Sequence, residues 1–443
     1  MSEPYFLNHR FAAHTRKDWE AEAKRTLKDR DLSDFTSHTA DGVEIDVLYQ
    51  GVTDAPPLTQ MAAVAPSIMS LVIENNGSVA NAHILSELEG GASGVVLPLV
   101  RSGKMGLPCE LDCLNEALAG VYLEAASLAF RPESEAIPAA TTLFKEFLAD
   151  QDEAYHSVSL GADPIGAAYS KGGAGVAEGL RAIAELAAKG EYSSNITLLT
   201  ASGIYAHEGG ATEAIELAAL ICSVVAFLRA LEYTGVTPEK GAPLISLELS
   251  ADADLFISLA KLRAARMTVA RLRQAANINS HFAGLHVQTS ARMMATSDVA
   301  TNMLRTTTAA LAAGLGGADS LTALPFTHAL GKPQGLARRI ARNTGAILAE
   351  ESFIGAVSDP SRGAGYIEDI SGKLAAQAWE HFRQIEAAGG VETPKGAGLL
   401  GDKIARAEVD RQTEISSGAT KLVGANAFVN KDDQPPKTEA WPT

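Results

Sequence analysis

Residues able to act as a general acid follow a short apolar run near the middle of the chain. Residues 196–201 are apolar or β-branched and too few for a helix, so we expect a buried strand there. Tyr205 and His207 come soon after this run, and a long apolar helix opens near Thr212. A phenol or an imidazole on such a loop can donate a proton or a hydrogen bond to a carbonyl oxygen. Tyr205 and His207 are therefore the catalytic candidates.

Both candidates also have a structural interpretation that involves no chemistry. His207 can be a loop histidine that is hydrogen-bonded at the rim of the fold or at a contact between subunits. Tyr205 can fill the top of the fold with its ring. The sequence alone leaves both interpretations open.

A second pair of polar residues, His286 and Gln288, lies within the strand-like run 285–289. Side chains two residues apart point to the same face of a strand, so we expect both to face the interior. They can line a substrate channel, or they can be interior polar groups that satisfy one another. Arg263 and Arg266 lie on a helical stretch, where we expect ion pairs between helices or contact with solvent.

The elements that carry these residues alternate between strand and helix along the chain. We expect strands at 68–73, 94–100, 121–124, 157–160, 196–201, 244–249, 285–289 and 320–324. We expect helices at 80–88, 139–150, 175–189, 212–233, 254–278, 297–313 and 336–351. Connections of this length join parallel neighbours, so the pattern favours a closed (β/α)8 TIM barrel over an open doubly wound sheet. In such a barrel the loop after each strand holds the chemistry, which is where Tyr205 and His207 fall.

Segments outside the alternating part define the remaining domains. Residues 1–57 form an N-terminal arm that we expect to contact another subunit, and the barrel runs over 58–352. Residues 353–430 form a C-terminal helical extension, with a helix near 374–388, that leads out of the barrel. Residues 431–443 are polar and contain prolines, so we expect a mobile tail.

Composition limits the classes of function. The formal net charge of −16 argues against nucleic acid or an anionic membrane as the main partner. The three cysteines suit a reducing cytoplasm, and Cys109 and Cys113 have no further ligands nearby for a metal site. No apolar stretch of signal-peptide length opens the chain, and the most apolar helix has only twelve residues between two charges. These features predict a soluble cytoplasmic protein that holds no metal and spans no membrane.

Short motifs spread along most of the chain resemble those of the adenosylcobalamin-dependent acyl-CoA mutases, the methylmalonyl-CoA mutase family. The matching residues are Thr39-x-Asp41-Gly42-Val43, Ser202-Gly203, Glu208-x-Gly210-Ala211, Lys261-Leu-Arg263-Ala-Ala-Arg266, His286-Val-Gln288-Thr289-Ser290, Ala341-Arg342-Asn343-Thr344, Asp359-Pro360 and Val423-Gly424-x-Asn426-x-Phe428. Each motif is weak by itself, and their combination is specific. The resemblance implies a (β/α)8 barrel that threads the pantetheine arm of coenzyme A along its axis, capped by a cobalamin domain. It also implies a radical shift of a carbonyl-CoA group, in which the cofactor carries the chemistry.

The chain departs from the catalytic members of this family where they carry functional groups. Tyr205 stands where they have a histidine that donates to the thioester carbonyl, and His207 lies two residues further on. Leu244 and Gly284 replace arginines, while Ser246, a further candidate for the substrate channel, is retained. Each lost charge-assisted contact to an anionic ligand is worth about 1.5–3 kcal/mol. The cobalt-binding Asp-x-His-x-x-Gly motif has no counterpart, so we expect no C-terminal cobalamin-binding domain.

These departures resemble the small (beta) subunit of heterodimeric methylmalonyl-CoA mutases, a barrel that supports a catalytic large (alpha) subunit. The resemblance then implies a complex that interconverts succinyl-CoA and methylmalonyl-CoA with adenosylcobalamin, while this chain binds no cofactor itself. Whether the chain binds an acyl-CoA ester alone stays open. The alternative is an active barrel subunit that uses a separately encoded cobalamin-binding protein, with Tyr205 or His207 as the acid.

Overall fold

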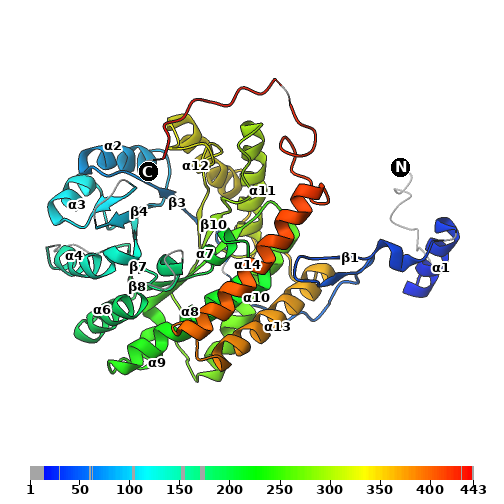
Figure 1. The fold of residues 1–443 in the computed structure, drawn as a ribbon, viewed down its shortest axis with the longest axis horizontal. Helices are drawn as coiled ribbons and strands as arrows, with labels where there is room; N and C mark the ends of the chain where they lie inside the picture. The colour runs from blue at the N-terminus through cyan, green and yellow to red at the C-terminus, as the bar shows by residue number, and fades with distance from the viewer. Residues whose placement is uncertain are drawn as a thin grey trace, which may run out of the picture.

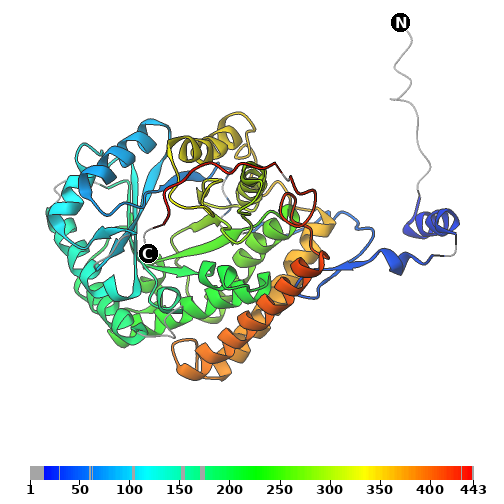
Figure 2. The same ribbon diagram turned by 45° about the horizontal axis from the view of Figure 1, so that its top comes forward.

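Eight parallel strands close into a barrel in the computed structural model, which describes residues 14–28, 30–58, 61, 63–101, 105–150, 155–169, 175–430 and 432–441. The strand order β3-β11-β10-β9-β8-β7-β6-β4 returns to its start because β3 also pairs with β4, and β5 lies outside the ring. Figure 1 and Figure 2 show the helices that surround this ring. The predicted (β/α)8 barrel is confirmed, and the alternative of an open sheet is wrong.

The barrel strands lie close to their predicted positions, with one exception. Their bounds are β3 (Ser67–Leu71), β4 (Gly94–Val100), β6 (Ser127–Pro132), β7 (Ser157–Ala162), β8 (Ile196–Ser202), β9 (Ile245–Ala251), β10 (Leu285–Thr289) and β11 (Ser320–Thr322), with β5 (Leu107–Pro108) beside β4. The strand predicted at 121–124 is wrong, because these residues form a turn in which the Tyr122 side chain is exposed. Leu128 and Phe130 of β6 provide the buried apolar positions instead.

The helices pack their apolar faces against the ring. Their bounds are α2 (Gly77–Glu89), α3 (Leu111–Leu118), α4 (Ile137–Asp150), α5 (Gly166–Tyr169), α6 (Val176–Lys189), α7 (Ile204–Glu208), α8 (Glu213–Tyr233), α9 (Pro238–Gly241), α10 (Leu255–Ala275), α11 (Asn302–Leu315) and α12 (Gly335–Glu350). Helix α8 is long and apolar enough to cross a membrane, so the prediction that it is too short was wrong. However, 83% of its most apolar window is buried, because α13 and α14 cover it from outside. It is a core helix of the barrel wall.

Two long helices, α13 (Gly365–Ala387) and α14 (Pro394–Ser417), follow the barrel. The prediction covered only part of α13 and missed α14, whose three glycines lower the helix propensity of its first turns. A capping signal was nevertheless present in the sequence. The Thr393 side chain accepts a hydrogen bond from the Gly396 amide, and Pro394 occupies the first turn.

The described part of the N-terminal arm leaves the barrel and ends in a separate helix. Helix α1 (Arg16–Leu27) stands away from the barrel in both views and has no buried residue (Figures 1 and 2). A short hairpin of β1 (Ser37–His38) and β2 (Glu44–Ile45) connects it to the body. Asp41, in the hairpin turn, accepts a hydrogen bond from the Ala214 amide at the start of α8. The root of the arm is therefore fixed, whereas α1 has little contact with the barrel.

The tail that was predicted to be mobile contacts the barrel where it is described, over 432–441. The Lys332 amide donates to the Glu439 carbonyl, and the Trp441 indole donates to the His328 carbonyl at 3.1 Å. The Trp441 ring also packs edge-on against the His328 ring. The mobility of this segment stays a prediction.

Candidate functional site

A cavity of about 980 Å³ occupies the interior of the barrel. Hydroxyl groups provide much of its lining, from Ser67, Ser127, Ser157, Ser159, Thr197, Thr200, Ser202, Ser246 and Ser320. Most barrels fill this space with branched apolar side chains, so the small residues at inward positions leave the interior hollow. Several hydroxyls satisfy one another across neighbouring strands: the Thr200 and Ser246 oxygens are 2.8 Å apart. Ser246, a predicted channel residue, therefore lines the cavity.

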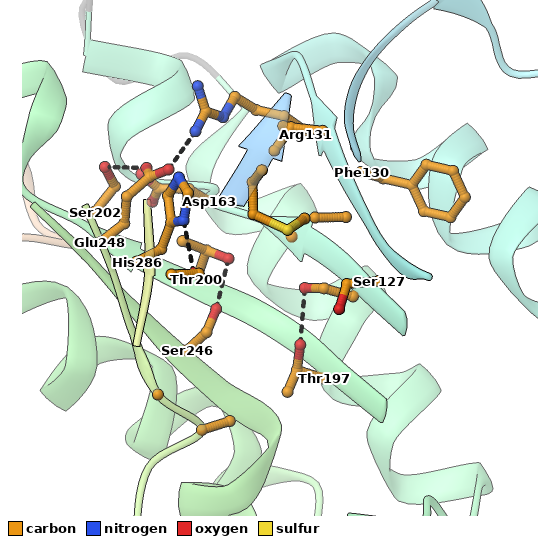
Figure 3. Close-up of a pocket in the computed structure, with 18 of the residues that line it drawn as sticks. Ser127, Phe130, Arg131, Asp163, Thr197, Thr200, Ser202, Ser246, Glu248 and His286 are labelled. Atoms are coloured by element: carbon orange, nitrogen blue, oxygen red, sulfur yellow. Dashed lines mark hydrogen bonds and ion pairs between the residues drawn. The ribbon is translucent and has the colours of Figure 1, made fainter. Parts of the chain in front are cut away.

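A charged cluster in the cavity joins strands that are not neighbours in the ring (Figure 3). Arg131, on β6, forms an ion pair with Glu248 of β9 and donates a second hydrogen bond to Gln288 Oε1 at 3.0 Å. The other carboxylate oxygen of Glu248 accepts from the Ser202 hydroxyl at 2.7 Å. The strand register places Ser202 of β8 and His286 of β10 directly beside Glu248, one on each side.

Burial and these charges determine the protonation of the cavity side chains. Burial, reinforced by Arg131 and opposed by Glu248, lowers the pKa of His286 to about 4. Burial raises the pKa of Asp163 to about 7, with Glu248 adding to the rise and Arg131 opposing it. His286 is therefore neutral at pH 7; its Nδ1 lies 2.8 Å from the Ser320 hydroxyl. Its Nε2 has no hydrogen-bond partner among the described residues.

The lowered pKa of His286 predicts how stability changes with pH. The unfolded chain binds this proton near the ordinary value of 6.5, and the folded protein binds it only near 4. The stability that neutral His286 contributes is therefore complete above about pH 6.5 and is lost as the pH falls towards 4. We expect His286→Gln to flatten the fall in melting temperature over this range relative to the wild type. His38→Gln, on exposed β1, should leave the dependence of melting temperature on pH unchanged. The same dependence in the wild type and both variants would contradict the lowered pKa of His286.

Tyr205 lines the cavity. Tyr205 lies in the short helix α7, which follows β8. Its ring packs against the Tyr169 ring at a centroid distance of 5.1 Å. Burial, with Asp163 and Cys222 contributing, raises the pKa of the phenol well above its ordinary value, and Ser223 opposes the rise. The phenol oxygen itself is buried and has no hydrogen-bond partner among the described residues.

His207 does not reach the cavity. Its side chain is fully buried, with Nδ1 3.1 Å from Glu216 Oε2 of α8 and Nε2 2.8 Å from the Ser290 hydroxyl. Burial lowers the pKa of this imidazole, although Glu216 opposes the shift. Serine, histidine and glutamate in this order resemble a nucleophilic triad, but the whole group is sealed from solvent. Such an arrangement holds α7 against α8 and β10 and offers no proton to a ligand.

The two residues predicted on β10 have different hydrogen-bond partners in the structure. His286 lines the cavity, and Gln288 accepts a hydrogen bond from Arg131, which also lines it. They do not hydrogen-bond to one another, because each uses a partner from a different strand. Their assignment to a substrate channel stays a prediction.

Sequence reasoning missed Arg131 and Glu248, the charged pair of the cavity. The strand that carries Arg131 was predicted a few residues too early, which left Arg131 in a loop. Glu248 lies two residues after Ser246 on the same strand, so the same spacing that placed Ser246 inside could have identified Glu248. The ion pair between helices predicted for Arg263 is confirmed, with Glu368 of α13 as partner and Asp359 as a second one. Arg266 instead pairs with Asp319, in the loop before β11.

The closed ring and the polar axial cavity define a (β/α)8-barrel protein with a hollow interior. The family model described as methylmalonyl-CoA mutase matches residues 103–442. The chain therefore belongs to the methylmalonyl-CoA mutase family.

Relatives in this family include proteins named as small and as large subunits. The methylmalonyl-CoA mutase small subunit of Streptomyces virginiae is 37% identical over 421 residues, 91% of this chain and 67% of that protein. The small subunit of Propionibacterium freudenreichii subsp. shermanii is 30% identical over 409 residues, 86% of this chain and 63% of that protein. The large subunit of Streptomyces virginiae is 34% identical over 240 residues, 53% of this chain. The chain thus spans about two thirds of the small subunits that it matches.

Proposed function

We propose that this chain is a non-catalytic small subunit of a heterodimeric methylmalonyl-CoA mutase, which interconverts succinyl-CoA and methylmalonyl-CoA. The position of His207 carries this proposal. An acid that polarises a thioester carbonyl must face the ligand, and His207 instead has both ring nitrogens engaged inside the barrel wall. Tyr205 is a poor replacement, since its hydroxyl oxygen is also buried.

The charge of the cavity also speaks against an anionic substrate on this chain. Arg131 is the only arginine or lysine among the described lining residues, and Glu248 already neutralises it. The lining further includes the carboxyl groups of Glu133, Asp163 and Asp319. A carboxylated acyl-CoA would enter this cavity without a free positive partner, which disfavours binding.

We assign adenosylcobalamin to the catalytic partner. When bound there, the cofactor supplies the radical chemistry of the complex. His207, which follows β8, does not fit a cobalt ligand, because its imidazole is fully buried and both of its ring nitrogens are engaged. The role left to this chain is to fold as a rigid barrel and to hold the partner. The three free cysteines Cys109, Cys113 and Cys222 support a location in the reducing cytoplasm.

The arm formed by residues 1–57 is the contact that we propose for the large subunit. Helix α1 lacks any buried residue, and Trp19 on it is 36% exposed. An isolated helix of twelve residues is marginal in water, so packing against another chain would stabilise it. The anchor at Asp41 fixes the direction in which the arm leaves the barrel.

Removal of the arm tests this proposal. We expect the chain to form a complex with a catalytic large subunit, and deletion of residues 1–35 to weaken association at least tenfold, about 1.4 kcal/mol. The deletion retains Asp41, so the barrel should keep its melting temperature. Tyr233→Ala, at a 93% exposed position, is the matched control and should associate normally. Sedimentation of the mixed subunits measures both; absence of any complex with the full chain would reject the small-subunit proposal.

The hollow barrel favours one alternative, an active subunit that uses a separately encoded cobalamin-binding protein. A cavity of about 980 Å³ is large enough for a chain-like ligand. Calorimetry with succinyl-CoA distinguishes the two functions. Micromolar binding that is lost in a Tyr205→Phe, His207→Ala double variant would favour the active subunit, and no binding at millimolar ligand favours the supporting role.

A further inference from the structure

We propose that the barrel cavity contains a carboxylate-binding site, built around Arg131, that the chain fills with its own Glu248. The site does not depend on the proposed role as a small subunit. It concerns only the side chains that meet inside this barrel.

The donors that surround Glu248 are those that proteins use for a ligand carboxylate. Arg131 supplies a guanidinium, which pairs with one oxygen, and the Ser202 hydroxyl donates to the other at 2.7 Å. Gln288 accepts a hydrogen bond from the second guanidinium nitrogen of Arg131 at 3.0 Å and so fixes the plane of the guanidinium group. A planar, charged fork with an added hydroxyl donor matches the two oxygens of one carboxylate.

The cluster faces open space, which separates it from an ordinary ion pair of a packed core. Arg131, Ser202, Glu248 and His286 all line the cavity. The Arg131 side chain is 34% exposed, although Glu248 is only 8% exposed. The Nε2 atom of His286 is buried and has no partner among the described residues. A small anion could therefore reach the guanidinium through the cavity if the Glu248 carboxylate were absent.

Glu248 thus acts as a tethered occupant. Its carboxylate is held at an effective concentration that a free ligand cannot match, so an anionic ligand must displace it to reach Arg131. The contact neutralises the charge of Arg131 inside the cavity. The class of ligand that the site would take is a short aliphatic carboxylate.

Substitution by alanine removes a group that acetate can replace atom for atom. Glu248→Ala deletes one methylene and the carboxylate, which together have the heavy atoms of acetate. The variant leaves Arg131 charged and without its partner inside the barrel. We expect sodium acetate to raise the melting temperature of Glu248→Ala by several degrees above its value in sodium chloride of equal ionic strength. The wild type should show no such difference.

Two controls separate a built site from a general salt effect. The double variant Arg131→Ala, Glu248→Ala should lose the response, because acetate has no guanidinium to bind. Glu386→Ala removes a glutamate that pairs with Arg229 on the outside of the protein, and it should not respond. If Glu248→Ala is insoluble in chloride, its soluble yield on refolding with and without acetate becomes the readout.

The result that overturns the proposal is equal stability or equal yield of Glu248→Ala in acetate and in chloride. A response of equal size in the double variant would overturn it as well. Neither outcome depends on association with a large subunit, so failure of this site and failure of the proposed function are distinguishable.

Discussion

Replacing Glu216 by alanine should lower the free energy of unfolding by about 3–5 kcal/mol. Glu216 lies on α8 and is completely buried. Its Oε2 atom is 2.5 Å from the Lys261 ammonium, whose side chain is also fully buried. Its Oε1 atom accepts from the amide and hydroxyl of Ser250 at 2.8 and 2.7 Å. Alanine at this position leaves a buried ammonium without a counter-charge, which is the costly way to break an ion pair.

The charge state of this cluster follows from its contacts. Burial alone would raise the pKa of Glu216, but Lys261 and His207 outweigh burial and hold the pKa well below its ordinary value. The carboxylate is therefore ionised at every pH at which the protein is handled. The cluster joins α8 to α10 and β9, so its loss should loosen the wall that carries α7 and Tyr205.

Urea denaturation of three variants measures this effect. Glu216→Ala should be the least stable, while Glu216→Ala combined with Lys261→Met should recover part of the loss, because no buried charge remains. Glu185→Ala is the exposed control, since Glu185 pairs with Lys189 on the surface at 3.7 Å and should cost no more than about 1 kcal/mol. A loss for Glu216→Ala no greater than for Glu185→Ala would show that solvent reaches Lys261.

Tyr205 lines the cavity and His207 does not, and this difference shows what the sequence could predict and what it could not. Strand β8 and helix α8 were predictable, because their apolar runs and their lengths are characteristic. The sequence predicts a loop for the residues between them, whereas they form the short helix α7. In a helix, two residues separated by two positions point in nearly opposite directions. Tyr205 therefore faces the cavity with its ring and His207 faces α8, although they are close in sequence.

The charged pair in the cavity was beyond sequence reasoning for another reason. Arg131 and Glu248 are 117 residues apart, and they meet only because the closed ring brings β6 and β9, three strands apart, to face the same interior. Local patterns indicate which face of a strand is buried, but they do not give the partner across a closed barrel. The shift of one predicted strand by a few residues was enough to remove Arg131 from the interior.

Arg263 presents the second large effect, because a single guanidinium joins the barrel to the helices that follow it. Its side chain is 1% exposed and forms ion pairs with Asp359 and with Glu368, the latter at 2.7 Å. Glu368 also accepts from the Gly363 amide, so the connection between barrel and α13 is organised around this arginine. Arg263→Met keeps most of the apolar volume and leaves two buried carboxylates without their shared cation. We expect a loss of about 3–5 kcal/mol in the free energy of unfolding.

The position of the loss should distinguish this variant from one that weakens the whole barrel. Because Arg263 connects α10 with α13, amide hydrogen exchange should accelerate first over Gly365–Ala387. Arg271→Met is the matched control on α10; Arg271 is exposed and lies 4.3 Å from the Trp379 ring, a contact worth about 0.5–1 kcal/mol. Equal losses of unfolding free energy in the two variants would mean that water solvates the Asp359 and Glu368 carboxylates when Arg263 is removed. A larger loss of stability for Arg263→Met, with faster exchange confined at first to α13, would show that one buried cation holds the outer helices on the barrel. These helices cover α8, so the same cation would also keep α8 buried.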